Sequence, residues 1–157
     1  MAHDLRPAGP ADVPAIEAVV RAAYAPYMPR IGREPGPMLD DYAALVRDGR
    51  VHVATRDDGG DGTRNVIEGV LVLVPEAGAM LLDNVAVAPA AQGMGLGRRL
   101  VAFAEAEARR AGLPVLRLYT NEAMAENLAI YARMGFRETH RAEDKGFRRV
   151  YMSKALA

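Results

Sequence analysis

Residues 87–100 read VAPAAQGMGLGRRL, an apolar strand that passes through a glycine-rich turn directly into an amphipathic helix. Gly93, Gly95 and Gly97 have no Cβ, so this backbone can adopt turn conformations closed to other residues and can approach a ligand closely. The first N–H groups of the following helix have no partner within it, and the helix dipole adds partial positive charge there. The turn is therefore predicted to bind an anion such as a pyrophosphate.

Two common phosphate-binding motifs do not match this turn. A P-loop ends in Gly-Lys-Ser or Gly-Lys-Thr, whereas Gly97 is followed by Arg98 and Arg99. A dinucleotide-binding fingerprint follows the first strand of its fold and has an acidic residue about 20 positions later, where this chain has an apolar run near Val115. Both classes are therefore disfavoured.

The turn and a second segment together resemble the GNAT acetyltransferase superfamily. The family's motif of Gln or Arg, two residues, Gly, one residue, and Gly or Ala is met by Gln92, Gly95 and Gly97. Downstream, residues 127–136 read NLAIYARMGF and resemble a second motif of the family. The resemblance implies an α+β fold in which helices flank a mixed, mostly antiparallel central sheet with one splayed central strand pair. It also implies an enzyme that uses acetyl-CoA as co-substrate.

The length of the chain predicts one domain over residues 1–157, and the resemblance implies that it is an N-acetyltransferase domain. Twenty basic and twenty acidic residues give zero formal charge, which argues against nucleic acid or an anionic membrane as a partner. The chain has no cysteine, and its three histidines lack ligand spacing, so we expect no metal site. The first seven residues have no apolar region typical of a signal peptide, and we expect a cytoplasmic protein.

The apolar pattern predicts strands and helices in a mixed order. Strands are expected at residues 51–55, 66–74, 80–87, 115–119, 136–140 and 147–153, with a polar hairpin tip at 57–62. One helix is expected to begin at an Asp12 cap and to bury Ile16, Val19, Val20 and Ala23. Two more are expected from Leu96 to a stop at Gly112 and over 123–134.

The resemblance implies which residues bind acetyl-CoA. The pantetheine arm would pair with the backbone of Val85, Ala86 and Val87, and an N–H near Val85 would polarise the thioester carbonyl. The phosphates would lie on the turn, whose members are Gln92, Gly93, Met94, Gly95, Leu96, Gly97 and Arg98. Arg98 or Arg99 would pair with a phosphate, since cations at a helix start otherwise oppose the dipole; solvated surface arginines are the alternative.

Asn127 lies four residues before Tyr131 and so shares its helical face, where it would bond the pantetheine amide. Many relatives place this asparagine seven residues before the tyrosine, where this chain has Met124. A capping or surface role for Asn127 therefore stays open.

Two residues are candidates for proton transfer. Tyr131 is the candidate general acid, because a phenol has a pKa of about 10 and stays protonated at neutral pH, so it can protonate the departing thiolate. The alternative is an aromatic side chain packed on the sheet. Asp83 is the candidate general base, and a structural carboxylate is its alternative. Some relatives use a glutamate where this chain has Tyr119.

The proline-rich segment 24–38 covers the acceptor site in the fold that the chain resembles. Tyr24, Tyr27, Arg30 and Arg33 would recognise an acceptor with a carboxylate, and a rigid surface loop is the alternative.

The predicted function is direct acetyl transfer to a primary amine of a small molecule. Two alternatives remain: a protein N-terminal acetyltransferase and a non-catalytic CoA-binding or sensing protein. Similar proteins often form homodimers.

Overall fold

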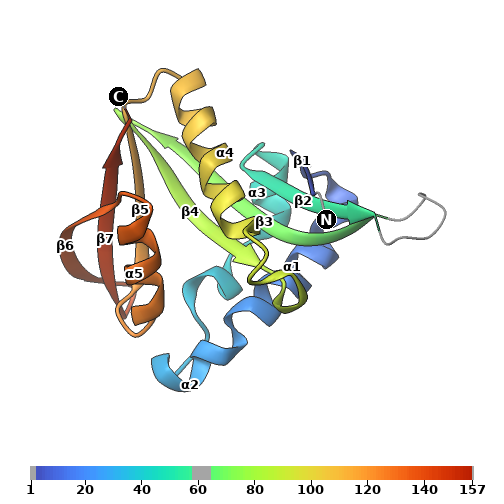
Figure 1. Ribbon diagram of the computed structural model, residues 1–157. Coiled ribbons are helices and arrows are strands. Elements are labelled where there is room, and N and C mark those ends of the chain that lie inside the picture. Colours follow the sequence, from blue (N-terminus) through green and yellow to red (C-terminus); the bar gives the residue numbers. More distant parts are fainter. Residues whose placement is uncertain (1–2, 58–64, 157) are drawn as a thin grey trace.

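The computed structural model describes residues 3–57 and 65–156, and in them seven strands form one sheet of order β1-β2-β3-β4-β5-β7-β6 (Figure 1). The strands are β1 (Asp4–Pro7), β2 (Val51–Asp57), β3 (Asn65–Glu76), β4 (Ala79–Val87), β5 (Val115–Asn121), β6 (Arg137–Asp144) and β7 (Phe147–Ala155). Every neighbouring pair is antiparallel except β4 and β5, which are parallel. The predicted mixed, mostly antiparallel sheet is confirmed.

Helices cover both faces of this sheet (Figure 1). They are α1 (Val13–Tyr24), α2 (Met28–Ile31), α3 (Tyr42–Arg47), α4 (Leu96–Arg110) and α5 (Ala125–Arg133). Helix α4 packs on one face of β3 and β4, and α1 packs on the other. Within the described ranges, no helix is long and apolar enough to cross a membrane.

The sheet separates two apolar cores because successive side chains of a strand point to opposite faces. Val70 and Val72 of β3 pack in the core beneath α1. Leu71 and Leu73 pack in the core beneath α4. The buried residues of α1 are Ile16, Val19 and Val20, and those of α4 are Leu96, Leu100, Val101, Ala104 and Ala108. The helical periodicity predicted for both segments is confirmed, and Gly112 ends α4 with a positive φ of 74°.

Strand β4 contains one extra residue, Asp83, opposite β3. Residues 72–73 of β3 pair with Asn84 and Leu82, so Asp83 has no partner and forms a bulge. Leu82 lies in the core beneath α4, but Ala86, four residues later, lies in the core beneath α1. The extra residue therefore reverses which face each later side chain of β4 occupies.

Strands β4 and β5 separate beside this bulge. They form three pairs, Met80 with Leu116, Leu81 with Arg117, and Leu82 with Leu118. Residues 83–87 and 119–121 continue as strands without pairing to each other, and the two ribbons diverge (Figure 1). The splayed central pair is confirmed, and it begins at Asp83.

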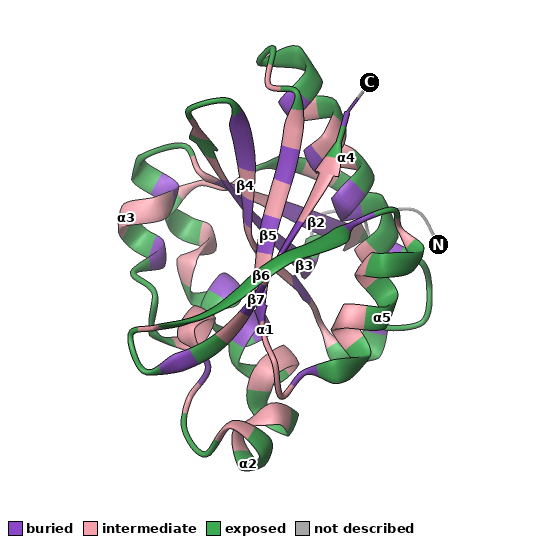
Figure 2. Cartoon of the chain, turned by 90° about the vertical axis from the view of Figure 1, so that its left-hand side faces the viewer, coloured by how far each residue is buried: buried purple, intermediate pink, exposed green. Residues whose placement is uncertain are grey.

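Strand β6 forms the outer edge of the sheet and is exposed along nearly all of its length (Figure 2). Its side chains are mostly charged or polar, which disfavours pairing with strands of other molecules. Buried positions lie instead on β5 and β7, the neighbouring strands toward the centre.

Several local predictions were wrong. The sequence pattern assigned no strand to β1, a four-residue edge strand that ends in proline. Asp12 is the N-cap residue of α1, as predicted, but its side chain makes no capping hydrogen bond; it accepts from the N–H of Gly9 and from Arg6. Helix α5 begins at Ala125, two residues later than predicted, and β5 extends two residues further, to Asn121.

The proline-rich segment 24–38 is more helical than a loop. It contains α2 and short 3-10 turns, and Pro26, Pro29 and Pro37 each occupy the second position of one of these elements, where a helix needs no N–H donor. The predicted hairpin tip at 57–62 lies, apart from Asp57, outside the described residues.

Gly69 on β3 allows α4 to approach the sheet closely. A Cβ at this position would lie 3.0 Å from the Ala54 Cβ and 3.2 Å from methyl groups of Leu96 and Leu100. Gly69→Ala is therefore expected to lower the free energy of unfolding by about 1–3 kcal/mol, measured by urea denaturation. Gly97→Ala is the matched control, since its Cβ meets only one atom, at 3.8 Å, and should be neutral or stabilising. Equal stability of Gly69→Ala and wild type would contradict the close packing.

Candidate active site

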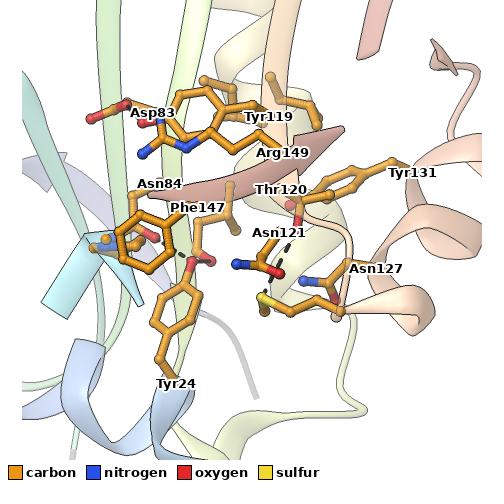
Figure 3. Close-up of a pocket in the computed structure, with 16 residues that line it drawn as sticks. Tyr24, Asp83, Asn84, Tyr119, Thr120, Asn121, Asn127, Tyr131, Phe147 and Arg149 are labelled. Atoms are coloured by element: carbon orange, nitrogen blue, oxygen red, sulfur yellow. Dashed lines mark hydrogen bonds between the residues drawn. The ribbon is translucent and has the colours of Figure 1, made fainter. Parts of the chain in front are cut away.

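Two cavities meet where β4 and β5 separate. The larger, about 450 Å³, is a groove between the glycine turn, β4 and α5. The smaller, about 50 Å³, lies beside the bulge and β5, and Figure 3 is a close-up of it. Five residues line both cavities: Tyr24, Val85, Met124, Asn127 and Tyr131. A ligand in the groove and one in the smaller pocket would therefore come together beside Val85 and Tyr131.

The glycine turn presents open backbone to the groove. Gly93 and Gly95 have φ values of 83° and 80°, a region that side chains disfavour, and no atom would contact a Cβ on either. The first hydrogen bond of α4 runs from the Arg99 N–H to the Gly95 carbonyl, so the N–H groups of residues 96–98 lie ahead of it. The Gln92 amide nitrogen donates to the Val87 carbonyl at 3.1 Å and ties the turn to β4.

Most of the predicted cofactor residues line this groove. They are Val85, Ala86, Val87, Gln92, Gly93, Gly95, Leu96, Gly97, Arg98 and Asn127. Met94 does not line it, and its side chain is 52% exposed. Gly97 has a helical backbone, and only Val87 lies near the position of a Cβ. The absence of a side chain at Gly97 therefore leaves room in the groove, and no unusual φ requires glycine there.

The two arginines that begin α4 differ in their positions. Arg98 lines the groove and Arg99 does not, although both are exposed. Neither has an acidic partner within ion-pair distance in the part of the chain that the structure describes. Of the two arginines, only Arg98 therefore lies against the groove.

Tyr131 extends from α5 into the cavity (Figure 3). Its ring meets Phe136 edge-on at 5.7 Å, so it also contributes to the core. Among residues 3–57 and 65–156, no group forms a hydrogen bond with its hydroxyl. Burial raises the pKa of Tyr131 to about 12. The phenol therefore stays protonated, with its proton available to a ligand.

Asp83 accepts a hydrogen bond of 2.7 Å from the Tyr119 hydroxyl. Burial and the neighbouring Asp83 charge both raise the pKa of Tyr119, so this hydroxyl remains a donor. Arg149 lies over the Tyr119 ring at 4.1 Å and donates to Asp144 at 2.6 Å. Burial, together with the charge of Asp83, raises the pKa of nearby Asp40 to about 6. Tyr119 therefore orients the Asp83 carboxylate through this hydrogen bond, and its own hydroxyl is not the base.

A buried hydrogen-bond chain that the sequence analysis missed closes one side of the site. The Tyr24 hydroxyl donates to the Asn84 side-chain oxygen at 2.6 Å, and the Asn84 amide donates to the Tyr42 hydroxyl at 3.0 Å. Tyr42 in turn donates to the Pro37 carbonyl. The chain joins α1, β4, α3 and the proline-rich segment. Its sequence signal was Asn84, a polar residue in an apolar strand that needs partners when buried.

Asn127 faces the cavities rather than capping a helix. It lines both cavities, and the cap of α5 is formed without a side-chain hydrogen bond. Met124, which stands where many relatives have asparagine, lines both cavities as well and is 4% exposed. Thr120 donates to its sulfur at 4.0 Å.

The four residues suggested for acceptor recognition separate in the structure. Tyr24 lines both cavities, and Tyr27 lines only the groove. Arg30 and Arg33 line neither. Across the described ranges, no three His, Cys, Asp or Glu side chains are grouped so that they could hold a metal ion.

Comparison with known proteins assigns the class. A family model described as an acetyltransferase (GNAT) domain matches residues 47–138, more than half of the chain. The protein is thus an acyltransferase. More specifically, the chain belongs to the GNAT acetyltransferase family.

One curated relative is similar over part of its length. It is an IAA acetyltransferase of Azospirillum brasilense, 38% identical over 68 residues that span 43% of this chain and 44% of that protein. The aligned region therefore covers less than half of the relative.

Two solved structures share the fold. The ribosomal-protein-S18-alanine N-acetyltransferase from Escherichia coli aligns with a TM-score of 0.76 and 18% identity, over 99% of this chain and 94% of its own. The PaiA N-acetyltransferase from Thermoplasma acidophilum, solved in complex with coenzyme A, aligns with a TM-score of 0.78 and 16% identity, over 99% of each chain. At these identities the likeness concerns the fold alone.

Proposed function

We propose that the protein transfers the acetyl group of acetyl-CoA directly to a primary amine of a small molecule. The observation that carries this proposal is the junction of the two cavities at Val85 and Tyr131. Acetyl-CoA would occupy the groove, with its phosphates on the glycine turn and its thioester at the junction. The amine would enter through the smaller pocket beside Asp83.

The transfer forms one bond and breaks one. The neutral amine attacks the thioester carbonyl, the new C–N bond forms, and the C–S bond breaks. Backbone of β4 near Val85, unpaired with β5, would hold the pantetheine arm and stabilise the carbonyl as it becomes an oxyanion. Tyr131 would donate its proton to the departing thiolate, because its hydroxyl is protonated and has no other partner in the described chain.

The proton lost by the amine would go to Asp83. Its carboxylate lies in the smaller pocket, held by the Tyr119 hydroxyl, and no cation of the described residues lies within ion-pair distance of it. A carboxylate at this position would also attract the ammonium form of the acceptor before proton transfer.

The size of the acceptor pocket favours a small molecule over a peptide. The pocket measures about 50 Å³ and is bounded by Gly36 and Pro37 of the proline-rich segment. The Tyr24, Asn84 and Tyr42 chain fastens this segment to β4. A pocket of this volume suits a small amine better than an extended peptide.

Calorimetric titration tests the cofactor assignment. Acetyl-CoA and CoA are expected to bind saturably, and NAD is expected not to bind. Thiol release in the presence of a panel of amines then tests catalysis. Folded protein that binds no acetyl-CoA would overturn the proposal, and binding without thiol release for any amine would favour a sensing protein.

Asp83→Asn is expected to lower kcat/KM for an amine by about 10- to 100-fold at neutral pH, measured by thiol release. The loss should shrink as the pH rises, since an alkylamine with a pKa of about 10.4 then arrives increasingly deprotonated. Asp48→Asn, at an exposed position after α3, is the control for loss of one carboxylate. A deficit that does not change with pH would argue for a structural carboxylate at position 83.

A further inference from the structure

A third cavity adjoins the acceptor pocket. It measures about 240 Å³ and shares two lining residues, Asn121 and Phe147, with that pocket. Three arginines line it, Arg30, Arg33 and Arg148. Their arrangement suggests an anionic ligand, provided that at least one guanidinium is not already neutralised.

Two of these arginines are neutralised by carboxylates of the chain. Arg30 donates to both oxygens of Glu126, at 2.6 and 2.8 Å. Arg148 pairs with Glu122 at 3.0 Å. Arg33 differs, because in the described ranges it has no carboxylate within ion-pair distance. The cavity therefore holds one positive charge without a partner.

The Arg33 guanidinium is held in place by neutral groups. It lies over the Phe147 ring with its central carbon 3.7 Å from the ring centroid. One of its nitrogens donates to the Lys145 carbonyl at 2.6 Å. Stacking and this single hydrogen bond fix the plane of the group but leave its other N–H groups available. A guanidinium that is already oriented loses less entropy when it binds a carboxylate through two hydrogen bonds.

Asn121 provides an oriented donor between the two cavities. Its side-chain oxygen accepts from the Ala123 N–H at 2.9 Å, which leaves the amide nitrogen as its available group. Figure 3 shows this side chain at the end of β5, with its nitrogen directed toward Phe147 and Tyr24. A ligand that passes from the acceptor pocket to Arg33 would therefore meet a donor at the boundary.

We propose that the acceptor carries a carboxylate in addition to its primary amine, and that Arg33 and Asn121 bind this carboxylate while the amine lies beside Asp83. This inference rests on the proposed acetyl transfer and names its substrate class, an amino acid whose amine and carboxylate are separated by a linker. The fixed cation at one end and the carboxylate of Asp83 at the other set the orientation of the acceptor.

The test compares acceptors that differ only in the carboxylate. Straight-chain ω-amino acids of increasing length and the alkylamines of the same length are assayed by thiol release with acetyl-CoA. We expect kcat/KM for the best amino acid to exceed that of its alkylamine by about 10- to 100-fold, as for a charged hydrogen-bonded pair. The Arg33→Gln variant should reduce this ratio to near one, mainly through KM.

Arg148→Gln is the matched control. It removes the same charge from the same cavity, but from a guanidinium that Glu122 already neutralises. The amino acid preference should therefore persist in this variant. Equal loss in both variants would mean that general electrostatic attraction causes the preference, and would overturn the assignment of Arg33.

A binding measurement separates failure of this inference from failure of the proposed function. Calorimetry with the same amino acid, in the presence of CoA, should show binding that Arg33→Gln weakens about 10-fold or more. If alkylamines and amino acids are acetylated equally well, acetyl transfer stands and the carboxylate site is refuted. If no amine is acetylated, the proposed function fails, and the binding measurement still decides whether Arg33 binds a carboxylate.

Discussion

Gly95→Glu is expected to weaken acetyl-CoA binding by at least about 100-fold, measured by calorimetry. The residue has a φ of 80° and is the N-cap of α4, so any side chain strains the turn and a carboxylate here faces the predicted pyrophosphate site. The groove would lose its open backbone, and the new charge would repel the phosphates at the position where the helix dipole otherwise attracts them.

Gly78→Glu is the matched control for this substitution. Gly78 has a similar φ of 75°, has no atom near a Cβ, and lies in the turn between β3 and β4, outside the groove. Its variant should suffer comparable backbone strain and still bind acetyl-CoA. Normal binding by folded Gly95→Glu would remove the glycine turn from the cofactor site.

Tyr131→Phe is expected to lower kcat by about 100-fold or more while acetyl-CoA binding changes little. The substitution removes the hydroxyl at the cavity junction but keeps the ring and its contact with Phe136. Thiol release and calorimetry measure the two effects separately. Burial raises the pKa of Tyr131 to about 12, so this phenol stays protonated up to about pH 11. Deprotonation of Tyr131 should therefore not lower wild-type kcat below that pH.

Tyr151→Phe controls for loss of a phenol elsewhere. Tyr151 lies on β7, where its ring stacks on His140 outside both cavities of the candidate site. Its variant should keep wild-type turnover. Unchanged kcat in Tyr131→Phe would leave Tyr131 as a packing residue, the alternative that its contact with Phe136 also supports.

Much of the groove could be predicted from local sequence. The glycine turn and the start of α4 occupy consecutive positions, so their mutual geometry follows from the backbone preferences of those residues. Tyr131 and Asn127 share one helical face for the same reason, and both line the cavities as their spacing predicts. Met94 was predicted to line the groove and does not, because the side chains of adjacent residues in a turn point in different directions.

The acceptor side could not be predicted in this way, because its residues come from distant segments. Tyr119 reaches Asp83 across 36 positions, and Arg33 reaches Lys145 across 112. Among the residues of the proline-rich segment, only the folded chain distinguishes Arg30, neutralised by Glu126, from Arg33, which has no carboxylate partner in the described chain. No local pattern carries this information, since both are exposed arginines of one short segment.

The sequence by itself determined the family, the element types of the core and the position of the glycine turn, all of which depend on residues close together in the chain. The tertiary structure alone decided where β4 leaves β5, because a bulge is defined by its partner strand. It also decided which charges have no partner, within the described residues, around the proposed acceptor pocket. Charge compensation depends on distances of a few ångströms between segments that the sequence separates widely.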